Sequence, residues 1–224
     1  MGIAAFSSAR DSLIAAVGDV TLTGEEACAV VARAIHDVAR CDAMALMSTD
    51  PETHLPAGGI VAGFDSTACV PFWDNELLDP DFNKFNDLAR RVEPIATLTE
   101  ATDGELTRSP RFQKLYSGYG ASDELRVVFM AGATCLAIAA AVRTDGEEYS
   151  PTEVRDVGNL LKPATEVLRR ALHQPDAGLL IAPAVLIIDP DGQLLSATNG
   201  AAELLLDLRI DIDGDLPGTI LVAA

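Results

Sequence analysis

Apolar residues recur at helical spacing in the segment that follows Thr23. The apolar positions in this segment are Ala27, Val30, Val31, Ala34, Ile35 and Val38. Spacings of three and four residues place them along one face of a helix. Thr23 and Glu26 form a capping-box pattern, in which each side chain accepts a hydrogen bond from the other residue's backbone. The sequence therefore predicts a helix that begins after Thr23 and packs through its apolar face.

Three further helix starts are marked by a capping residue followed by proline. They are Asp79-Pro80, Ser109-Pro110 and Ser150-Pro151. Proline suits the first helical position because the missing N–H would have no partner there. We expect the first helix to run through Phe82, Phe85 and Leu88, and the second through Phe112, Leu115 and Tyr116 to a stop at Gly118. The third is expected to run from Glu153 to Leu172.

Between these helices lie apolar runs typical of strands. The predicted strands span residues 44–48, 59–64, 94–98, 125–130 and 134–143. The last two are joined by Ala131-Gly132-Ala133, which is short enough for a hairpin and so for an antiparallel pair. A strand that passes directly to the next favours an α+β fold over a doubly wound parallel sheet.

The helix expected after Ser150 has a seam of apolar residues that alternate by three and four. The seam consists of Val154, Val157, Leu161, Ala164, Leu168 and Ala171. Such a seam fits a helix that covers its own sheet, and it fits equally well a helix that pairs with a partner helix. Pro163 is expected to kink the helix midway.

A second unit is predicted near the C-terminus. Pro175, Gly178 and Pro183 separate it from the helix that ends near His173, so we divide the chain into residues 1–173, a linker 174–183, and residues 184–224. The second unit reads as a strand at 184–189, a turn at 190–192, a strand at 193–198 and a helix capped by Asn199. Few residues follow this helix, and the unit is expected to be partial.

Charge excludes some partners. The chain has 34 acidic and 16 basic residues and a net charge of −18, which repels nucleic acid and anionic membranes. The N-terminus lacks a signal pattern, and the longest apolar stretch, residues 135–142, is too short to span a membrane. These features lead us to expect a cytoplasmic protein.

No cofactor or metal is expected. Cys28, Cys41, Cys69 and Cys135 are widely spaced, without the ligand spacing of a zinc site. His36, His54 and His173 are predicted at the surface rather than as haem ligands. The acidic run from Asp207 to Asp215 does not match an EF-hand, because its glycine would place arginine at the first loop position. Nucleotide-binding glycine motifs do not occur in the sequence.

Five segments together resemble the N-terminal sensory region of LuxR-type helix-turn-helix transcription regulators. They are residues 71–76 (PFWDNE), 81–90 (DFNKFNDLAR), 94–98 (PIATL), 108–112 (RSPRF) and 123–129 (DELRVVF). Such regions are similar to GAF domains, and residues from 184 onward resemble the opening of a PAS domain. The resemblance implies a GAF-like antiparallel sheet covered by helices, with long N- and C-terminal helices, followed by a partial PAS-like β-β-α segment. The basic DNA-binding domain of the family has no counterpart in this chain, which is therefore expected to be a fragment.

The resemblance also implies a pocket between the sheet and residues 64–119. Candidate ligand-binding residues are Phe72, Trp73, Phe82, Phe85, Tyr116, Tyr119, Arg126 and Phe129. Aromatic rings there either stack on a flat ligand or fill a core. The charged residues of the same region either select a polar ligand or, as we expect, pair with one another: Asp74, Glu76, Lys84, Asp87, Arg90, Glu124 and Arg126. For Arg126 the expected partner is Asp87 or Glu124.

The function implied is non-catalytic sensing. A small effector binds the GAF-like domain, and the signal passes through a helical homodimer interface to the missing DNA-binding domain. The expected dimer contacts lie in the helices at 8–17 and 152–172, at Leu13, Val17, Val154, Val157, Leu161 and Leu168. Two alternatives are a structural dimerisation module with a filled core and a sulfoxide reductase using Cys69 and Cys135. The reductase is disfavoured because an apolar strand around Cys135 raises the pKa of its thiol.

Overall fold

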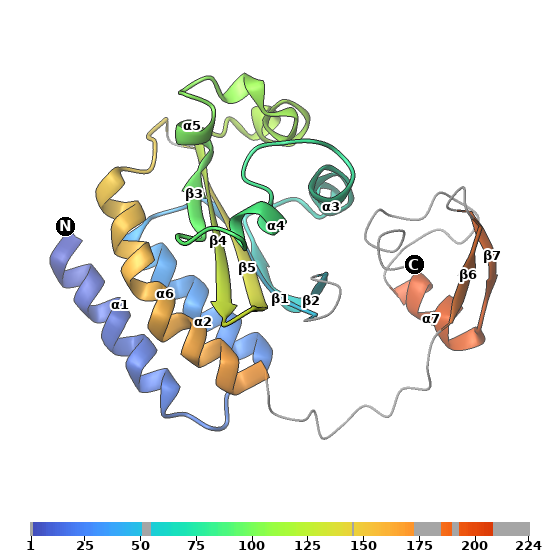
Figure 1. Ribbon diagram of the computed structural model, residues 1–224, viewed down its shortest axis with the longest axis horizontal. Helices are drawn as coiled ribbons and strands as arrows, with labels where there is room; N and C mark the ends of the chain where they lie inside the picture. The colour runs from blue at the N-terminus through green and yellow to red at the C-terminus, as the bar shows by residue number, and fades with distance from the viewer. Residues whose placement is uncertain (1, 51–54, 145, 173–184, 190–192, 208–224) are drawn as a thin grey trace.

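The computed structural model describes residues 2–50, 55–144, 146–172, 185–189 and 193–207. Its centre is a five-stranded antiparallel sheet in the order β2-β1-β5-β4-β3 (Figure 1). The strands are β1 (Ala43–Thr49), β2 (Pro56–Ala62), β3 (Ile95–Thr97), β4 (Asp123–Ala131) and β5 (Thr134–Arg143). Helices accompany this antiparallel sheet, so the predicted α+β class is confirmed.

The two helices that pack directly on the sheet begin at capping boxes. At α2 (Gly24–Val38), Glu26 N donates to Thr23 Oγ1 over 3.2 Å and Thr23 N donates to the Glu26 carboxylate over 2.9 Å. At α6 (Pro151–Leu172), Ser150 and Glu153 exchange the same two bonds. The predicted starts at Thr23 and Ser150 are thus confirmed, and α6 continues through Pro163.

Strand alternation separates the two faces of the sheet. β4 pairs with β5 through Leu125↔Ala141 and Val127↔Ala139, and their side chains enter one buried cluster. Arg126 and Val128, which alternate with Leu125 and Val127 along the strand, face the opposite side of the sheet. Because both faces are covered, almost every residue of β4 and β5 is buried.

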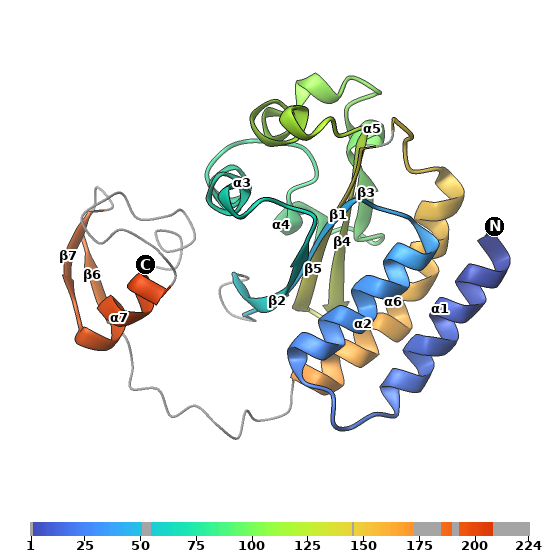
Figure 2. The ribbon, with the colours of Figure 1, turned by 180° about the vertical axis from the view of Figure 1, so that it is seen from behind.

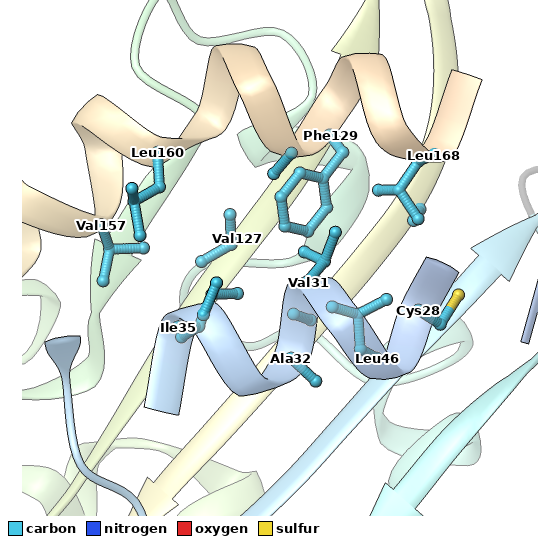
Figure 3. Close-up of a cluster of buried hydrophobic side chains, with 14 of the residues drawn as sticks. Cys28, Val31, Ala32, Ile35, Leu46, Val127, Phe129, Val157, Leu160 and Leu168 are labelled. Atoms are coloured by element: carbon cyan, nitrogen blue, oxygen red, sulfur yellow. The ribbon is translucent and has the colours of Figure 1, made fainter. Parts of the chain in front are cut away.

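Helices form two layers over the first face. α2 and α6 pack directly on the sheet, and α1 (Gly2–Val17) lies outside them, against both (Figures 1 and 2). Figure 3 shows Phe129 of β4 between α6 and α2, near Leu168 and Val31. Leu13 joins α1 to this core and is 0% exposed.

Short elements cover the second face. They are η1 (Ser66–Ala68), α3 (Cys69–Leu77), α4 (Phe85–Leu88), α5 (Leu98–Ala101), η2 (Leu106–Arg108), η3 (Phe112–Tyr116) and η4 (Ser117–Tyr119). The helix expected from Pro80 is wrong: only one turn forms, at α4, because Asn83 has a left-handed φ of 52° that interrupts it. The helix after Ser109 does form, but it ends at Gly120, with φ of 67°, two residues beyond the expected Gly118.

The C-terminal unit contains a hairpin of β6 (Leu186–Ile188) and β7 (Leu194–Ala197), followed by α7 (Asn199–Asp207). The helix is capped by Thr198 rather than by Asn199, because Ala201 N donates to Thr198 Oγ1 over 3.4 Å. The expected linker 174–183, the turn 190–192 and the acidic residues after Asp207 lie outside the described residues. In the described part of the chain, every helix is too short or too polar to cross a bilayer.

Candidate functional site

A mostly apolar cavity of about 360 Å³ lies on the second face of the sheet. β1 and β2 form its floor, and η1, α3 and the helical turns at 112–119 form its walls. Its lining consists of Ala45, Met47, Val61, Phe64, Asp65, Ala68, Cys69, Phe72, Trp73, Leu115, Tyr116 and Tyr119. The volume falls within the range of small-molecule sites, roughly 300–1,000 Å³.

The aromatic side chains around this cavity contact one another in pairs. Phe72 and Trp73, in the first turns of α3, meet edge to face with ring centroids 5.2 Å apart. Phe64 stacks on Tyr116 with centroids 6.5 Å apart. These are the offset and edge-to-face arrangements that aromatic rings prefer, and all four rings lie in the lining of the cavity.

A network of fully buried charges lies on the same face of the sheet. Arg126 Nη1 donates to Glu76 Oε2 over 2.6 Å, and Arg126 Nε donates to Glu124 Oε1 over 2.9 Å. Arg111 binds the other oxygen of Glu124 through Nη2 at 2.7 Å and Nε at 3.1 Å. Both guanidiniums are 0% exposed. Such a network is stable only when every charge has a partner.

Two further charged residues extend the network. Asp81 accepts hydrogen bonds from Ser109 Oγ and from Arg111 N, and its carboxylate lies 3.6 Å from Arg111 Nη1. Lys84 donates through Nζ to the carbonyl oxygens of Asn75 and Asp79. These bonds hold the irregular segment 79–84 in place, which explains why Asp81 and Lys84 are polar positions where a helix was expected.

Electrostatics keep the buried carboxylates ionised. Burial raises the pKa of the Glu124 carboxyl, but the guanidiniums of Arg111 and Arg126 outweigh burial, and the pKa is lowered. Burial also raises the pKa of Asp81, but Arg111 and the surrounding hydrogen bonds outweigh burial, so the pKa is lowered overall. The pKa of Arg126 is raised: burial opposes its charge, but Glu124 and Glu76 more than compensate. Glu124, Asp81 and Arg126 are therefore each shifted toward the charged form.

The cavity and the charge network meet at two side chains. Tyr116, in the cavity wall, donates its hydroxyl to Glu124 Oε1 over 2.8 Å. Phe72, which also lines the cavity, places its ring 5.3 Å from the guanidinium carbon of Arg126. A molecule in the cavity would thus contact two residues that hold the network.

The predicted ligand-binding residues divide into three groups. Phe72, Trp73, Tyr116 and Tyr119 line the cavity. Phe85 and Arg126 lie behind the wall: the Phe85 ring is 4.4 Å from the Arg126 guanidinium and contacts Phe72.

The other two do not line the cavity. Phe82 lies under the guanidinium of Arg108, at 5.4 Å. The expectation for Phe129 is wrong, because strand alternation turns it to the opposite face, into the core beneath α6 (Figure 3).

Charge pairing inside the region agrees with the sequence interpretation in part. Arg126 pairs with Glu124, one of its two expected partners, and also with Glu76. Asp87, the other expected partner, pairs instead with Arg90 at the surface. Arg111 and Asp81 were not predicted as members of the network, because a polar residue in a loop has no sequence signal for burial.

The expected dimer contacts are largely used within the chain. Leu13 and Leu168 are 0% exposed and Val157 is 1% exposed, all in the core that joins α1, α2, α6 and the sheet. These three are therefore closed to a second chain in this structure. Val17, Val154 and Leu161 remain partly exposed. The apolar seam of α6 thus packs on helices and strands of its own chain.

All four cysteines are free thiols. Cys69 is exposed at the cavity, whereas Cys135 is buried in an apolar cluster, and burial raises the pKa of its thiol. Burial also raises the pKa of Cys28 to about 11. A raised pKa leaves little thiolate at neutral pH, which works against a reductase based on Cys69 and Cys135.

No protein-family model matches this sequence, and no curated protein is significantly similar to it.

Proposed function

We propose that this chain is the sensory part of a LuxR-type transcription regulator, and that its GAF-like domain binds a small effector in the aromatic cavity. The observation that carries the proposal is an apolar space of about 360 Å³ with aromatic walls, in direct contact with a buried charge network. A filled core would leave no such space. The cavity thus favours a sensor over a structural dimerisation module.

The residues that support the family resemblance also build the site. Phe72 and Trp73 of the cavity and Glu76 of the network come from residues 71–76. Glu124 and Arg126 come from residues 123–129. The resembling segments contain all six charged residues of the network but only Phe72 and Trp73 of the cavity lining, so the resemblance supports the network more directly than the cavity.

The route of the signal follows the contacts of β4. This strand carries Glu124 and Arg126 on the cavity side and packs against α6 through Phe129 on the other side. An effector that favours one position of Phe72 or Tyr116 would shift the balance between two arrangements of β4 and α6. Output through DNA then requires a DNA-binding domain outside these 224 residues.

A homodimer is part of the proposal, with the contact placed at the part of α6 that its own chain leaves accessible. Val154 and Leu161 are the candidates, since both are only partly buried. Leu13, Val157 and Leu168 are not proposed as dimer contacts, because they lie in the core of their own chain.

Native mass spectrometry of the purified full chain tests the proposal. We expect a dimer that carries, or acquires from a small-molecule extract of the host cells, a non-covalent mass that disappears on denaturation. Ala45→Phe, which fills the cavity floor, should abolish the added mass. Ala15→Phe, at an exposed position of α1, is the matched control and should retain it. A bare wild-type chain under both conditions would instead favour the structural dimerisation module.

A further inference from the structure

One charged donor of the network has no hydrogen-bond partner. Among the described residues, three buried side-chain N or O atoms make no hydrogen bond: Thr99 Oγ1, Tyr149 OH and Arg126 Nη2. Arg126 is 0% exposed, so water does not reach this nitrogen. Leaving a buried donor unpaired destabilises a fold, and native structures rarely do so without a reason.

The unpaired nitrogen lies on the edge of the guanidinium that faces Glu124. In the planar guanidinium, Nη2 shares one edge with Nε. That edge faces Glu124, whose Oε1 accepts from Arg126 Nε and from the hydroxyl of Tyr116 in the cavity wall. The open donor is therefore near Tyr116.

Strand register connects the cavity floor to Arg126. Val61 pairs with Ala45, Ala45 pairs with Ala140, and Ala140 pairs with Arg126, so the four form one cross-strand row on the same face. Val61 and Ala45 line the cavity, and only the small Ala140 separates them from Arg126. The ring of Phe72 covers this end of the row, 5.3 Å from the guanidinium.

Charge balance restricts what Arg126 can accept. The network contains three cations, Arg111, Arg126 and Lys84, and three anions, Glu76, Glu124 and Asp81. An anionic ligand would add a buried charge without a counterion, which is costly. A neutral acceptor such as a carbonyl oxygen would satisfy the donor and leave the balance unchanged.

We propose that Nη2 of Arg126 is the polar anchor of the cavity, and that the ligand is a flat, uncharged molecule with a hydrogen-bond acceptor, such as an aromatic ketone. The Phe72 ring turns aside to admit the acceptor, while Trp73 and Tyr119 cover the apolar body. This inference rests on the proposed function of the cavity as a ligand site and names the chemistry of its ligand.

Matched probes separate the anchor from simple apolar binding. Acetophenone and α-methylstyrene have the same shape but differ by a carbonyl oxygen in place of a methylene, and benzoate carries a negative charge. Trp73 is the protein's one tryptophan and lines the cavity, so its indole N–H resonance in the ¹⁵N-labelled full chain reports binding. We expect acetophenone to bind at least as tightly as α-methylstyrene, and benzoate to bind more weakly than acetophenone.

Other outcomes overturn specific steps. In a cavity without an anchor, burying the carbonyl is unfavourable, and α-methylstyrene would bind about tenfold or more tightly than acetophenone. Tighter binding of benzoate would contradict an uncharged ligand. If none of the probes moves the Trp73 resonance, both the proposed function of the cavity and the anchor fail. If the probes bind but α-methylstyrene binds about tenfold or more tightly than acetophenone, only the anchor fails.

A conservative variant tests Arg126 directly. Arg126→Lys keeps the charge but removes the planar fork and Nη2. We expect it to bind acetophenone about tenfold more weakly and α-methylstyrene with little change. Equal effects on both probes would overturn the anchor. The comparison of probes on the wild-type chain decides the question even where this variant does not fold.

Discussion

At the scale of single residues, Glu124 is the centre of the charge network. Its two oxygens accept hydrogen bonds from Arg111, Arg126 and Tyr116, and it is 1% exposed. Its position in β4 follows from strand alternation, since Leu125 and Val127 point to the helical core. The two-residue spacing of Glu124 and Arg126 in a predicted strand places both on one face, so this pair can be predicted from the sequence. Arg111 reaches Glu124 from 13 residues away and Glu76 reaches Arg126 from 50 residues away, and no local pattern encodes either contact.

Removing the charge of Glu124 should destabilise the fold. Glu124→Gln leaves Arg111 and Arg126 without their shared anion, and breaking a buried pair in this way costs about 3–5 kcal/mol. The free energy of unfolding in urea, followed by circular dichroism, measures the loss. Glu166→Gln, which removes a partly exposed partner of Arg169 and Arg170, serves as the control and should change stability far less. Equal losses in the two variants would contradict the network's role.

At the scale of elements, the periodic helices and strands were predictable, and the irregular second face was not. α2, α6 and the hairpin of β4 and β5 follow from capping boxes, apolar spacing and a short turn. The helix expected at Pro80 fails because Asp81 bonds across to Ser109 and Arg111, and Asn83 adopts a left-handed conformation. The sequence does not show whether the apolar seam of α6 packs on its own chain or on a partner helix, because both contacts require the same apolar spacing.

Two adjacent residues test which face of α1 packs on α2 and α6. Leu13 is 0% exposed at this contact, whereas the neighbouring Ile14 is 54% exposed. Leu13→Ala should lower the free energy of unfolding by about 2–5 kcal/mol, and Ile14→Ala should change it by about 0.5 kcal/mol or less. Urea unfolding of the two variants measures both. A larger loss for Ile14→Ala would show that the helix presents a different face to the core.

At the scale of the whole molecule, stability depends on pH through the buried carboxylates. Glu124 and Asp81 have pKa values lowered by their guanidinium partners against the effect of burial. A carboxyl whose pKa is lower in the folded state stabilises the fold above its unfolded pKa, and this contribution is lost as the pH falls through the folded pKa. Burial raises the pKa of Asp123, whose contribution has the opposite sign.

We therefore expect acid to weaken the fold. Between pH 7 and about pH 5 the contribution of Glu124 and Asp81 should stay constant, and below about pH 4 it should fall. Urea unfolding across this range measures the effect. The dependence on pH should be shallower in Asp81→Asn, which cannot gain the proton. A free energy of unfolding that stays constant down to pH 3 would contradict the assignment.

We expect the aromatic cavity beside the charge network to admit a small molecule. The most direct test is the Trp73 indole N–H resonance of the ¹⁵N-labelled full chain during titration with acetophenone, in the wild type, Ala15→Phe and Ala45→Phe. We expect a saturable shift in the wild type and in Ala15→Phe, and binding at least about tenfold weaker in Ala45→Phe, whose ring occupies the cavity floor. An unmoved resonance in the wild type, or the same titration in all three chains, would contradict it.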